Sequence, residues 1–415
     1  MGATASGERP NVVLIISDDQ GWADYGFMGH PTISTPNLDA LAAGGVVYDR
    51  GYVTAPLCSP SLASIVTGLY PRQTQIRGND PVGETKKMDP EVRAALRERM
   101  YAPMQIHESF VKRLRSNGYA TLQTGKWWAG DPRDHGFEQA MTHGDTRRGG
   151  RHGDDGLAIG RSTMRPITEF VERAVDDEEP FFIWYGVFLP HSPHNAPERL
   201  VAKYRDVAPS EAIAWYWANC EWLDETCGQL LDCLKENGVY DDTLVVYTCD
   251  NGWGQDPEVR HKDDGRSKRY PTEMVIRTPI IVSHPAELQP VRDKRALASN
   301  IDIAPTILHA CGIKPADGMT GLDLRDPDLL RKRDRVFVEA YEHDSDLDHL
   351  DDPDHGLLAR VVIEGWGKLV DYGSRVELFN LKPDVDGRLD RQQIDAYRGA
   401  RLAGILQQWL DADRR

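Results

Sequence analysis

Five continuous apolar runs constrain the fold of this chain more than any other feature. Each run is short and bounded by turn-forming residues, which is typical of a strand rather than a helix. Strands that are apolar on both sides belong in a parallel sheet covered by helices on both faces. The runs are Asn11–Ser17, Tyr119–Thr124, Pro180–Phe188, Thr243–Thr248 and Pro279–Ser283. We therefore expect an α/β fold built on a mostly parallel sheet.

Polar side chains with metal-binding or anion-binding chemistry follow four of these runs. In chain order they are Asp18 and Asp19, Lys126, His191, and Asp250 with Asn251. Because ligands of open α/β sheets collect beyond the carboxyl ends of the strands, we expect these side chains to meet in one crevice. Paired oxygen ligands suit Ca²⁺ or Mg²⁺ better than zinc. Taken alone, the Asp pair after a strand is more often a helix cap or a turn, but the recurrence of polar residues at successive strand ends predicts a site.

A cysteine stands at the start of an expected helix within the stretch Ala55–Gly68. Proline is favoured in the first helical turn, so Pro60 places Cys58 at or just before the helix N-terminus. The unpaired N–H groups and the helix dipole there favour an anion, either a thiolate or a bound oxyanion. The alternative is a buried structural thiol on a capped helix.

The segments between these features have a less distinct pattern. Residues 79–105 are charged, and we expect a mobile insertion there, whereas residues 131–165 resemble a loop rich in Gly, Asp, Arg and His. The stretch Ser210–Asn237 predicts a helix. Its three cysteines fit a reduced apolar face better than disulfides or a zinc site, and they are Cys220, Cys227 and Cys233.

The pattern of predicted secondary structure changes after Arg333. Short strands followed by one helix, over about residues 391–412, predict a small antiparallel α+β unit. We therefore divide the chain into a catalytic α/β domain, residues 1–333, and a small C-terminal α+β subdomain, residues 334–415.

The formal net charge of −16 limits the partners of this protein. A negative field repels nucleic acid and anionic membranes, so we expect neither as a partner. An acidic protein that binds an anionic substrate must concentrate positive charge locally, through a metal ion or a few lysine and histidine side chains. The polar start, Met1–Pro10, and the lack of a transmembrane run lead us to expect a cytoplasmic protein.

Eight short motifs follow one another along nearly the whole chain. They are Asn11–Asp19, Cys58–Ser61, Thr67–Arg72, Gly125–Trp127, Pro190–Pro193, Asp250–Gly252, Ile276–Pro279 and Asp302–Thr306. In this order and spacing they resemble the sulfatase family of the alkaline phosphatase superfamily. The resemblance implies a large mixed, mostly parallel sheet between helices, with a small C-terminal antiparallel α+β subdomain.

The resemblance also implies a cofactor and roles for individual residues. The family binds Ca²⁺, with Mg²⁺ or Mn²⁺ as alternatives here, and the matching ligands are Asp18, Asp19, Cys58, Asp250 and Asn251. The family cysteine is oxidised to formylglycine, whose hydrated aldehyde attacks sulfur, so residue 58 would carry the nucleophile. Lys126 and Lys268 would bind the sulfate oxygens, and His191 would protonate the leaving alcohol.

Two positions beside the nucleophile depart from the family pattern. Leu62 stands where the family has an arginine that the maturation enzyme recognises, and Trp128 stands where a histidine is common. Both missing groups contact formylglycine in the family, so these positions leave open whether Cys58 is converted. Residues of the following loop that could replace them are His135, His143, Arg151 and His152.

Three functions follow from this pattern. The first is a metal-dependent hydrolase of sulfate esters that acts on a small anionic substrate, such as a sulfated sugar or an aryl sulfate. The second keeps Cys58 as a thiol and cleaves a phosphate or phosphonate ester with a thiolate or a metal-bound hydroxide. The third is a catalytically inactive relative that binds an anionic ligand. The carboxylates count against the third, because buried negative charge without its metal is destabilising.

Overall fold

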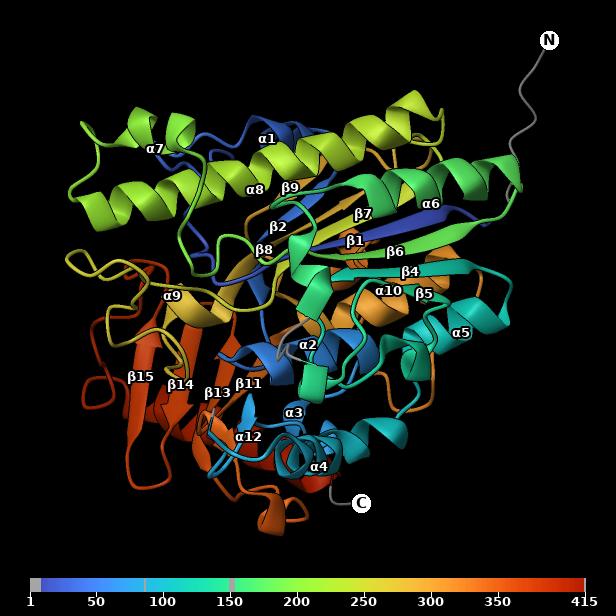
Figure 1. The fold of residues 1–415 in the computed structure, drawn as a ribbon. Helices are drawn as coiled ribbons and strands as arrows, with labels where there is room; N and C mark the ends of the chain where they lie inside the picture. The colour runs from blue at the N-terminus through green and yellow to red at the C-terminus, as the bar shows by residue number, and fades with distance from the viewer. Residues whose placement is uncertain (1–8, 86, 149–153, 414–415) are drawn as a thin grey trace.

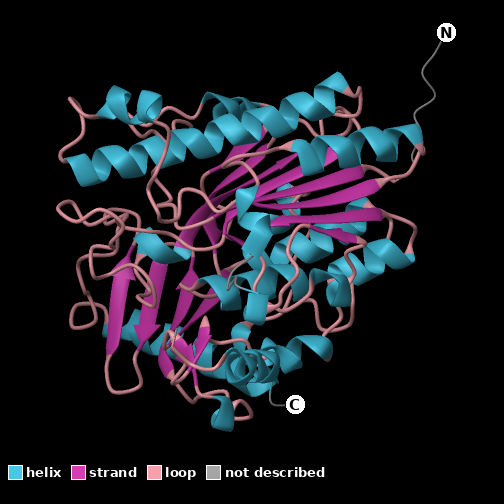
Figure 2. Ribbon diagram, in the orientation of Figure 1, coloured by secondary structure: helices cyan, strands magenta, loops and turns pink. Residues whose placement is uncertain are grey.

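The structure is a computed structural model that describes residues 9–85, 87–148 and 154–413. This part of the chain forms a nine-stranded sheet with helices on both faces and a second, four-stranded sheet beside it (Figures 1 and 2). The predicted α/β architecture with an additional antiparallel sheet is therefore confirmed. None of the helices in the described ranges has the length and apolar character needed to span a bilayer.

The main sheet contains all five predicted strands, with boundaries shifted by two residues at most. Its members are β1 (Asn11–Ser17), β2 (Val46–Tyr52), β4 (Ala120–Gly125), β5 (Gln139–Ala140), β6 (Phe181–Gly186), β7 (Thr243–Cys249), β8 (Arg277–Ser283), β9 (Val291–Asp293) and β10 (Ala298–Ser299). The strand order is β10-β2-β8-β7-β1-β6-β4-β5, and β9 pairs with β2. Strand β8 runs antiparallel to β2 and β7, whereas β7, β1, β6 and β4 are parallel neighbours.

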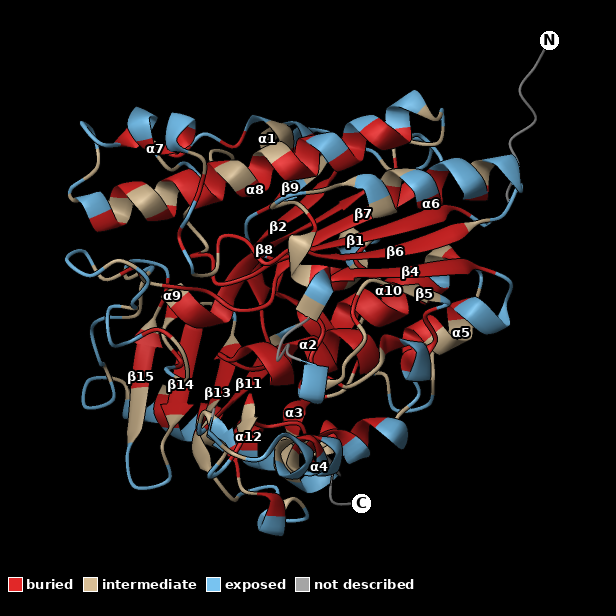
Figure 3. Ribbon diagram, in the orientation of Figure 1, coloured by how far each residue is buried: buried red, intermediate tan, exposed pale blue. Residues whose placement is uncertain are grey.

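Helices pack on both faces of this sheet because its central strands are apolar on both sides. On β1, Val13 and Ile15 face one core, and Leu14 and Ile16 face the other. Figure 1 shows α1 (Pro36–Ala43), α6 (Arg165–Asp176) and α8 (Glu211–Glu236) on one face. On the opposite face lie α2 (Cys58–Thr67), α5 (Phe110–Ser116) and α10 (Ile303–Ala310). The strands between them are buried along most of their length (Figure 3). The three cysteines of α8 are buried and free, as predicted.

The second sheet is antiparallel throughout. It consists of β11 (Arg335–Tyr341), β13 (Leu357–Glu364), β14 (Gly367–Asp371) and β15 (Val376–Asn380). The last helix, α12 (Ala396–Asp413), packs on it through Leu402 and Leu406, which share a core with Val362 and Leu369. The division of the chain at residue 333 stays a prediction.

The expectation of a mobile insertion over residues 79–105 is wrong. This segment holds β3 (Asp80–Pro81) and a helix, α4 (Pro90–Tyr101). Asp89 caps the helix and Pro90 occupies its first turn, a start signal that the charged composition obscured. Strand β3 pairs with β12 (Asp344–Ser345), which ties the segment to the C-terminal part.

The remaining helices are short. They are α3 (Pro71–Thr74), α7 (Glu198–Tyr204), α9 (Glu273–Ile276) and α11 (Pro327–Leu330). The edge strand β5 lies within residues 131–165, which we expected to be loop throughout.

Candidate active site

The polar residues predicted at the strand ends lie together at one edge of the main sheet. Strands β7, β1, β6 and β4 are adjacent and parallel, so their carboxyl ends coincide. Asp18 bridges to Pro190 in the β6 loop, and its main-chain N–H donates to the carbonyl of Leu189 at 2.9 Å. Asp19 has a φ of 58°, in the left-handed region, which is a strained conformation of the kind found at functional sites.

Two lysines neutralise most of the carboxylate charge. Lys126 Nζ lies 2.7 Å from Asp18 Oδ2 and 3.0 Å from Asp250 Oδ2. Lys268 Nζ lies 3.0 Å from Asp19 Oδ2. The three carboxylates are 2% exposed or less, so they depend on these ammonium groups rather than on water.

The lysines do not fully offset the effect of burial on the pKa values of the carboxyl groups. Burial, reinforced by the nearby charge of Asp18, raises the pKa of Asp250 to about 7. Burial also raises the pKa of Asp18, although Lys126 opposes it. Burial acts in the same direction on Asp19, but Lys268 and His191 outweigh it and lower the pKa of that carboxyl. The cluster therefore holds more negative charge than its own cations neutralise.

Cys58 lies at the first residue of α2, as predicted, and is 1% exposed. Its Sγ is 3.4 Å from Lys268 Nζ and 4.0 Å from Asp18 Oδ1. Burial raises the pKa of the thiol to about 12, even though Lys126 and Lys268 favour the thiolate. The thiol of the metal-free protein is therefore protonated at neutral pH.

His191 lies beside Lys268 on the more open side of the site. Its Nε2 is 3.5 Å from Lys268 Nζ and 3.3 Å from Asp19 Oδ2, and its Nδ1 is 2.6 Å from the carbonyl of Ser192. Burial lowers the pKa of His191 to about 3, so the ring is neutral. The His191 and Lys268 side chains are 18% and 17% exposed, compared with 4% for Lys126. Solvent therefore reaches the site from this side.

Asn251 carries an acceptor that the described protein leaves unpaired. Its Nδ2 donates to Asp19 Oδ1 at 2.7 Å and to the carbonyl of Gly252 at 3.0 Å, whereas its buried Oδ1 finds no donor among the described residues. An unpaired buried acceptor is costly, and a cation would satisfy it. Ligand atoms of Asp18, Cys58 and Asp250 also lie within 4.8 Å of one another. The residues present therefore fit a hard divalent cation such as Ca²⁺.

Leu62 and Trp128, the two positions that differ from the expected motif, are buried in the apolar core. Leu62, one turn along α2 from Cys58, is 1% exposed, and Trp128 is 2% exposed. Both belong to one apolar core cluster that includes Trp127. The Trp127 and Trp128 ring centroids are 5.0 Å apart. Leu62 and Trp128 thus belong to the same apolar core cluster.

The loop histidines proposed as replacements are bound elsewhere. His135 Nε2 lies 3.0 Å from the carbonyl of Ala129, and His143 Nδ1 lies 3.2 Å from Asp154 Oδ2. Arg151 and His152 lie outside the described residues.

Two positioning residues were missed by sequence reasoning. Asn79 Oδ1 accepts a hydrogen bond from the main-chain N–H of Ser59 at 2.9 Å, which fixes the start of α2. Arg161 Nη2 donates to the carbonyl of His191 at 2.9 Å and thereby holds the loop of that histidine. Both residues are distant in sequence from the groups they support, and no local pattern marks them.

Comparisons with known proteins cover nearly the whole chain. Residues 10–313 match the family model described as Sulfatase, and residues 265–384 match the C-terminal model of N-sulphoglucosamine sulphohydrolase. The N-acetylgalactosamine-6-sulfatase of Homo sapiens is 26% identical over 381 residues, covering 80% of this chain and 68% of that protein.

Two solved structures share the fold. The structure of Ps i-CgsB in complex with k-i-k-neocarrahexaose superposes with a TM-score of 0.75 at 21% identity, covering 97% of this chain and 93% of that one. The structure of BT4656 in complex with its substrate D-glucosamine-2-N,6-O-disulfate gives a TM-score of 0.69 at 18% identity, covering 97% and 98%.

Proposed function

The chain belongs to the sulfatase family and is a sulfuric ester hydrolase, and from this premise we propose that it cleaves sulfate esters at a metal site beside Cys58. The observation that carries the proposal is the convergence of three buried carboxylates, Asn251 and two lysines on the N-terminus of α2. We further propose that the substrate is a sulfated sugar.

The charge of the cluster supports a singly charged ester as substrate. With all three carboxylates ionised, as a bound cation would keep them, the three carboxylates against two ammonium groups leave one negative charge, because His191 is neutral. A divalent cation would convert this into one positive charge. A sulfate monoester carries one negative charge and balances it, whereas the dianion of a phosphate monoester does not.

The metal would be held by Asp18, Asp19, Asp250, the free Oδ1 of Asn251 and the group at residue 58. Bound there, it supplies positive charge that stabilises the sulfuryl oxygens as negative charge develops on them. The lysines now paired with these carboxylates would then be available to the substrate. Lys126 and Lys268 would donate hydrogen bonds to the sulfate oxygens and orient the ester.

Departure of the alcohol requires a proton, and His191 is placed to deliver it. Its Nε2 faces the ammonium group of Lys268 at 3.5 Å on the open side of the site. We propose that Nε2 of His191 delivers this proton, while Lys268, whose pKa Asp19 raises against the opposing effect of burial, keeps its own proton and stays an ammonium group. Arg161 would position the ring through its hydrogen bond to the His191 carbonyl.

The substrate class rests on the relatives and stays a proposal. The human relative is named for N-acetylgalactosamine-6-sulfate, and the two solved structures contain a carrageenan oligosaccharide and a disulfated glucosamine. The name of the human relative and the ligands of the two structures all point to sulfated sugars, which supports a sulfated sugar as the substrate here.

A second candidate differs in the nucleophile. Leu62 and Trp128 make the flank of Cys58 apolar, and this observation favours an unmodified thiol that cleaves a phosphate or phosphonate ester. A phosphonate monoester also carries one negative charge, so it too would balance the single positive charge of the metal-loaded site. The raised pKa of Cys58 counts against a free thiolate, which would need the metal as its partner.

Mass analysis combined with activity assays separates the candidates. The tryptic peptide Gly51–Arg72 of active protein contains Cys58 as its single cysteine. We expect the mass change that accompanies conversion of a thiol to an aldehyde, together with turnover of an aryl sulfate. An unmodified thiol in protein that cleaves an aryl phosphonate would support the second candidate. An unmodified thiol without turnover of either ester would indicate an anion-binding relative.

A further inference from the structure

A second cluster of metal-binding side chains lies in the C-terminal part, outside the carboxylate cluster of the active site. It borders a cavity of about 320 Å³ that is lined by residues 341–346, 349, 350, 355 and 356, with Arg77, Val82 and Arg269. Arg269 follows Lys268 directly, so this C-terminal cavity lies next to the active-site segment. The cluster itself consists of Asp346, His349 and His355.

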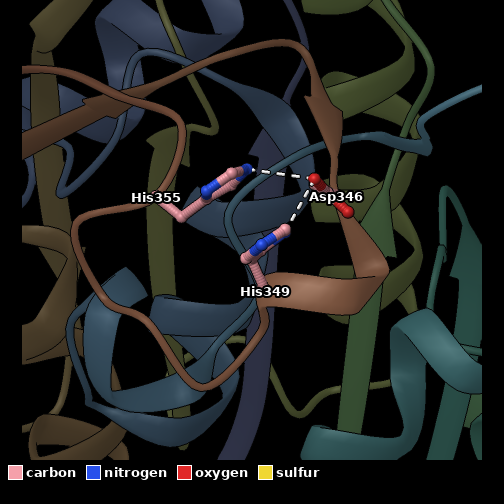
Figure 4. Close-up of side chains that lie close together, drawn as sticks. All are labelled: Asp346, His349 and His355. Atoms are coloured by element: carbon pink, nitrogen blue, oxygen red, sulfur yellow. Dashed lines mark hydrogen bonds and ion pairs between the residues drawn. The ribbon is translucent and has the colours of Figure 1, made fainter.

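The two histidines aim a ring nitrogen at the same carboxylate oxygen (Figure 4). His349 Nδ1 lies 2.9 Å and His355 Nε2 lies 3.1 Å from Asp346 Oδ2. Ligand atoms that surround a zinc ion at about 2.0–2.1 Å lie roughly 2.9–3.4 Å from one another in octahedral to tetrahedral geometry. The carboxylate–imidazole spacings therefore match those of a metal site.

The imidazole rings need a small rotation to complete such a site. They stack with their centroids 4.2 Å apart and an angle of 7° between their planes, so a single ion cannot lie in the planes of both rings as they stand. A metal requires the two lone pairs to converge. The side chains of His349 and His355 are 53% and 38% exposed, which leaves them free to turn.

The backbone that carries these side chains is held by hydrogen bonds from Arg77 and Tyr341. Arg77 donates hydrogen bonds to the carbonyls of His349, Leu350 and Asp352, and Tyr341 Oη donates to the carbonyl of Pro353 at 2.9 Å. Asp346 Oδ1 accepts from the N–H of Asp348 at 3.0 Å. The other carboxylate oxygen, Oδ2, faces the histidines. The three ligands therefore project from a segment whose position is fixed before any ion binds.

The segment that carries the ligands is acidic, although arginines pair with two of its aspartates and line the cavity. Arg99 pairs with Asp348, Arg360 pairs with Asp354, and Arg77 and Arg269 line the cavity. Residues 344–355 contain six aspartates and two histidines and no lysine or arginine. Hydrogen bonds from the N–H of Asp348 and from His349 lower the pKa of Asp346, so its carboxylate is ionised at neutral pH. Two imidazoles and one carboxylate are a borderline donor set, which suits zinc or a similar transition metal and not calcium.

We propose that Asp346, His349 and His355 form a second metal site that takes Zn²⁺ or a similar transition-metal ion, with open coordination positions toward the C-terminal cavity. The site is independent of the proposed hydrolase function, because it shares no ligand with the carboxylate cluster. Its imidazole and carboxylate donors favour a transition metal, whereas the oxygen ligands of the active site fit a hard cation such as Ca²⁺.

Zinc titration of the full chain in excess Ca²⁺ tests this proposal. Isothermal titration is expected to show one zinc equivalent, and Co²⁺ in place of zinc is expected to give a visible absorption band from imidazole ligation. The variants His349→Ala and His355→Ala should each weaken zinc binding by about a hundredfold or more. If an alanine variant does not fold, the same titration is made with His349→Gln or His355→Gln instead.

Two controls distinguish the site from other sources of zinc binding. His309→Ala removes an exposed histidine elsewhere and should leave the titration unchanged. Asp250→Asn alters the active-site carboxylates and should also retain the zinc equivalent. The proposal is overturned if the wild-type chain binds no zinc, which leaves a hydrogen-bonded cluster only, or if the histidine variants bind zinc as the wild type does.

Discussion

The two flanks of Cys58 differ in what they contribute to the fold. On one flank, three carboxylates, two lysines and the unpaired Oδ1 of Asn251 are buried at a cost in stability. On the other, Leu62 and Trp128 lie in the apolar core, although Trp128 Nε1 is itself a buried donor without a partner among the described residues. A buried polar cluster of this kind is costly without a ligand, which supports the proposal that the polar flank is the functional one.

Replacing a carboxylate on the polar flank should have the largest effect. We expect Asp250→Asn to lower sulfate-ester turnover by about a thousandfold or more, because it removes a metal ligand and a partner of Lys126. The chelated variant should unfold at the same temperature as the wild type or higher, since the substitution removes a buried charge. Kinetics and thermal unfolding in chelator measure the two effects.

A buried carboxylate outside the site provides the matched control. Asp302 is fully buried and pairs with Arg333 at 2.5 Å. Asp302→Asn should lower the unfolding temperature and leave calcium binding intact. If Asp250→Asn also lowers the unfolding temperature and leaves calcium binding intact, the distinction between functional and structural carboxylates is wrong.

Removing a lysine should have the next largest effect. We expect Lys126→Met to lower turnover by roughly a hundredfold, because the sulfate oxygens lose a donor. It should also destabilise the chelated protein, since Asp18 and Asp250 lose their partner, and Ca²⁺ should restore much of that stability. Lys235→Met, at an exposed lysine paired with Asp232, serves as the control and should change neither property. Unchanged turnover in Lys126→Met would remove this lysine from the mechanism.

On the apolar flank we expect a loss of stability without a loss of chemistry. Leu62→Ala should lower the free energy of unfolding by about 2–5 kcal/mol, because it leaves a cavity in the core. Leu62→Met keeps most of the volume and should cost less than about 1.5 kcal/mol. Denaturant unfolding gives the stabilities, and turnover per folded molecule should stay within a few-fold of the wild type. A large fall in turnover with little loss of stability would place Leu62 in the site chemistry.

The last prediction concerns the pH dependence of the stability of the chelated protein. The pKa of Asp250 is about 7 in the folded state and near 3.8 in the unfolded chain, so the folded protein binds the extra proton between these values. The stability of the wild type relative to Asp250→Asn should therefore be greatest below about pH 4 and fall as the pH rises to about 7. Unfolding of both proteins at several pH values measures this difference. A difference that grows with pH would contradict the assigned protonation of Asp250.

The sequence predicted the location of the polar flank but not its interactions. Apolar runs such as Asn11–Ser17 specify parallel strands, and the parallel arrangement alone brings Asp18 and Asp250 to one edge. The pairing of Lys126 with both carboxylates depends on side-chain positions across three strands, which no local pattern encodes. The free Oδ1 of Asn251 is likewise visible only once every neighbouring donor is placed.

Local signals also failed where tertiary contacts decide the structure. The charged composition of residues 79–105 suggested mobility, yet Arg97 is buried in α4 and pairs with Asp80 and Glu84. Leu62 and Trp128 were identified from the sequence as departures from the family pattern. Their common packing with Trp127 is a property of the folded core.

Sulfate release before and after metal removal tests the central claim most directly. The full chain is assayed on an aryl sulfate and a sulfated monosaccharide, first with Ca²⁺, then after chelation, and again after Ca²⁺ is restored. We predict turnover that disappears on chelation and returns with Ca²⁺. Turnover that survives chelation, or no sulfate release under any of the three conditions, would contradict a metal-dependent sulfate-ester site at Cys58.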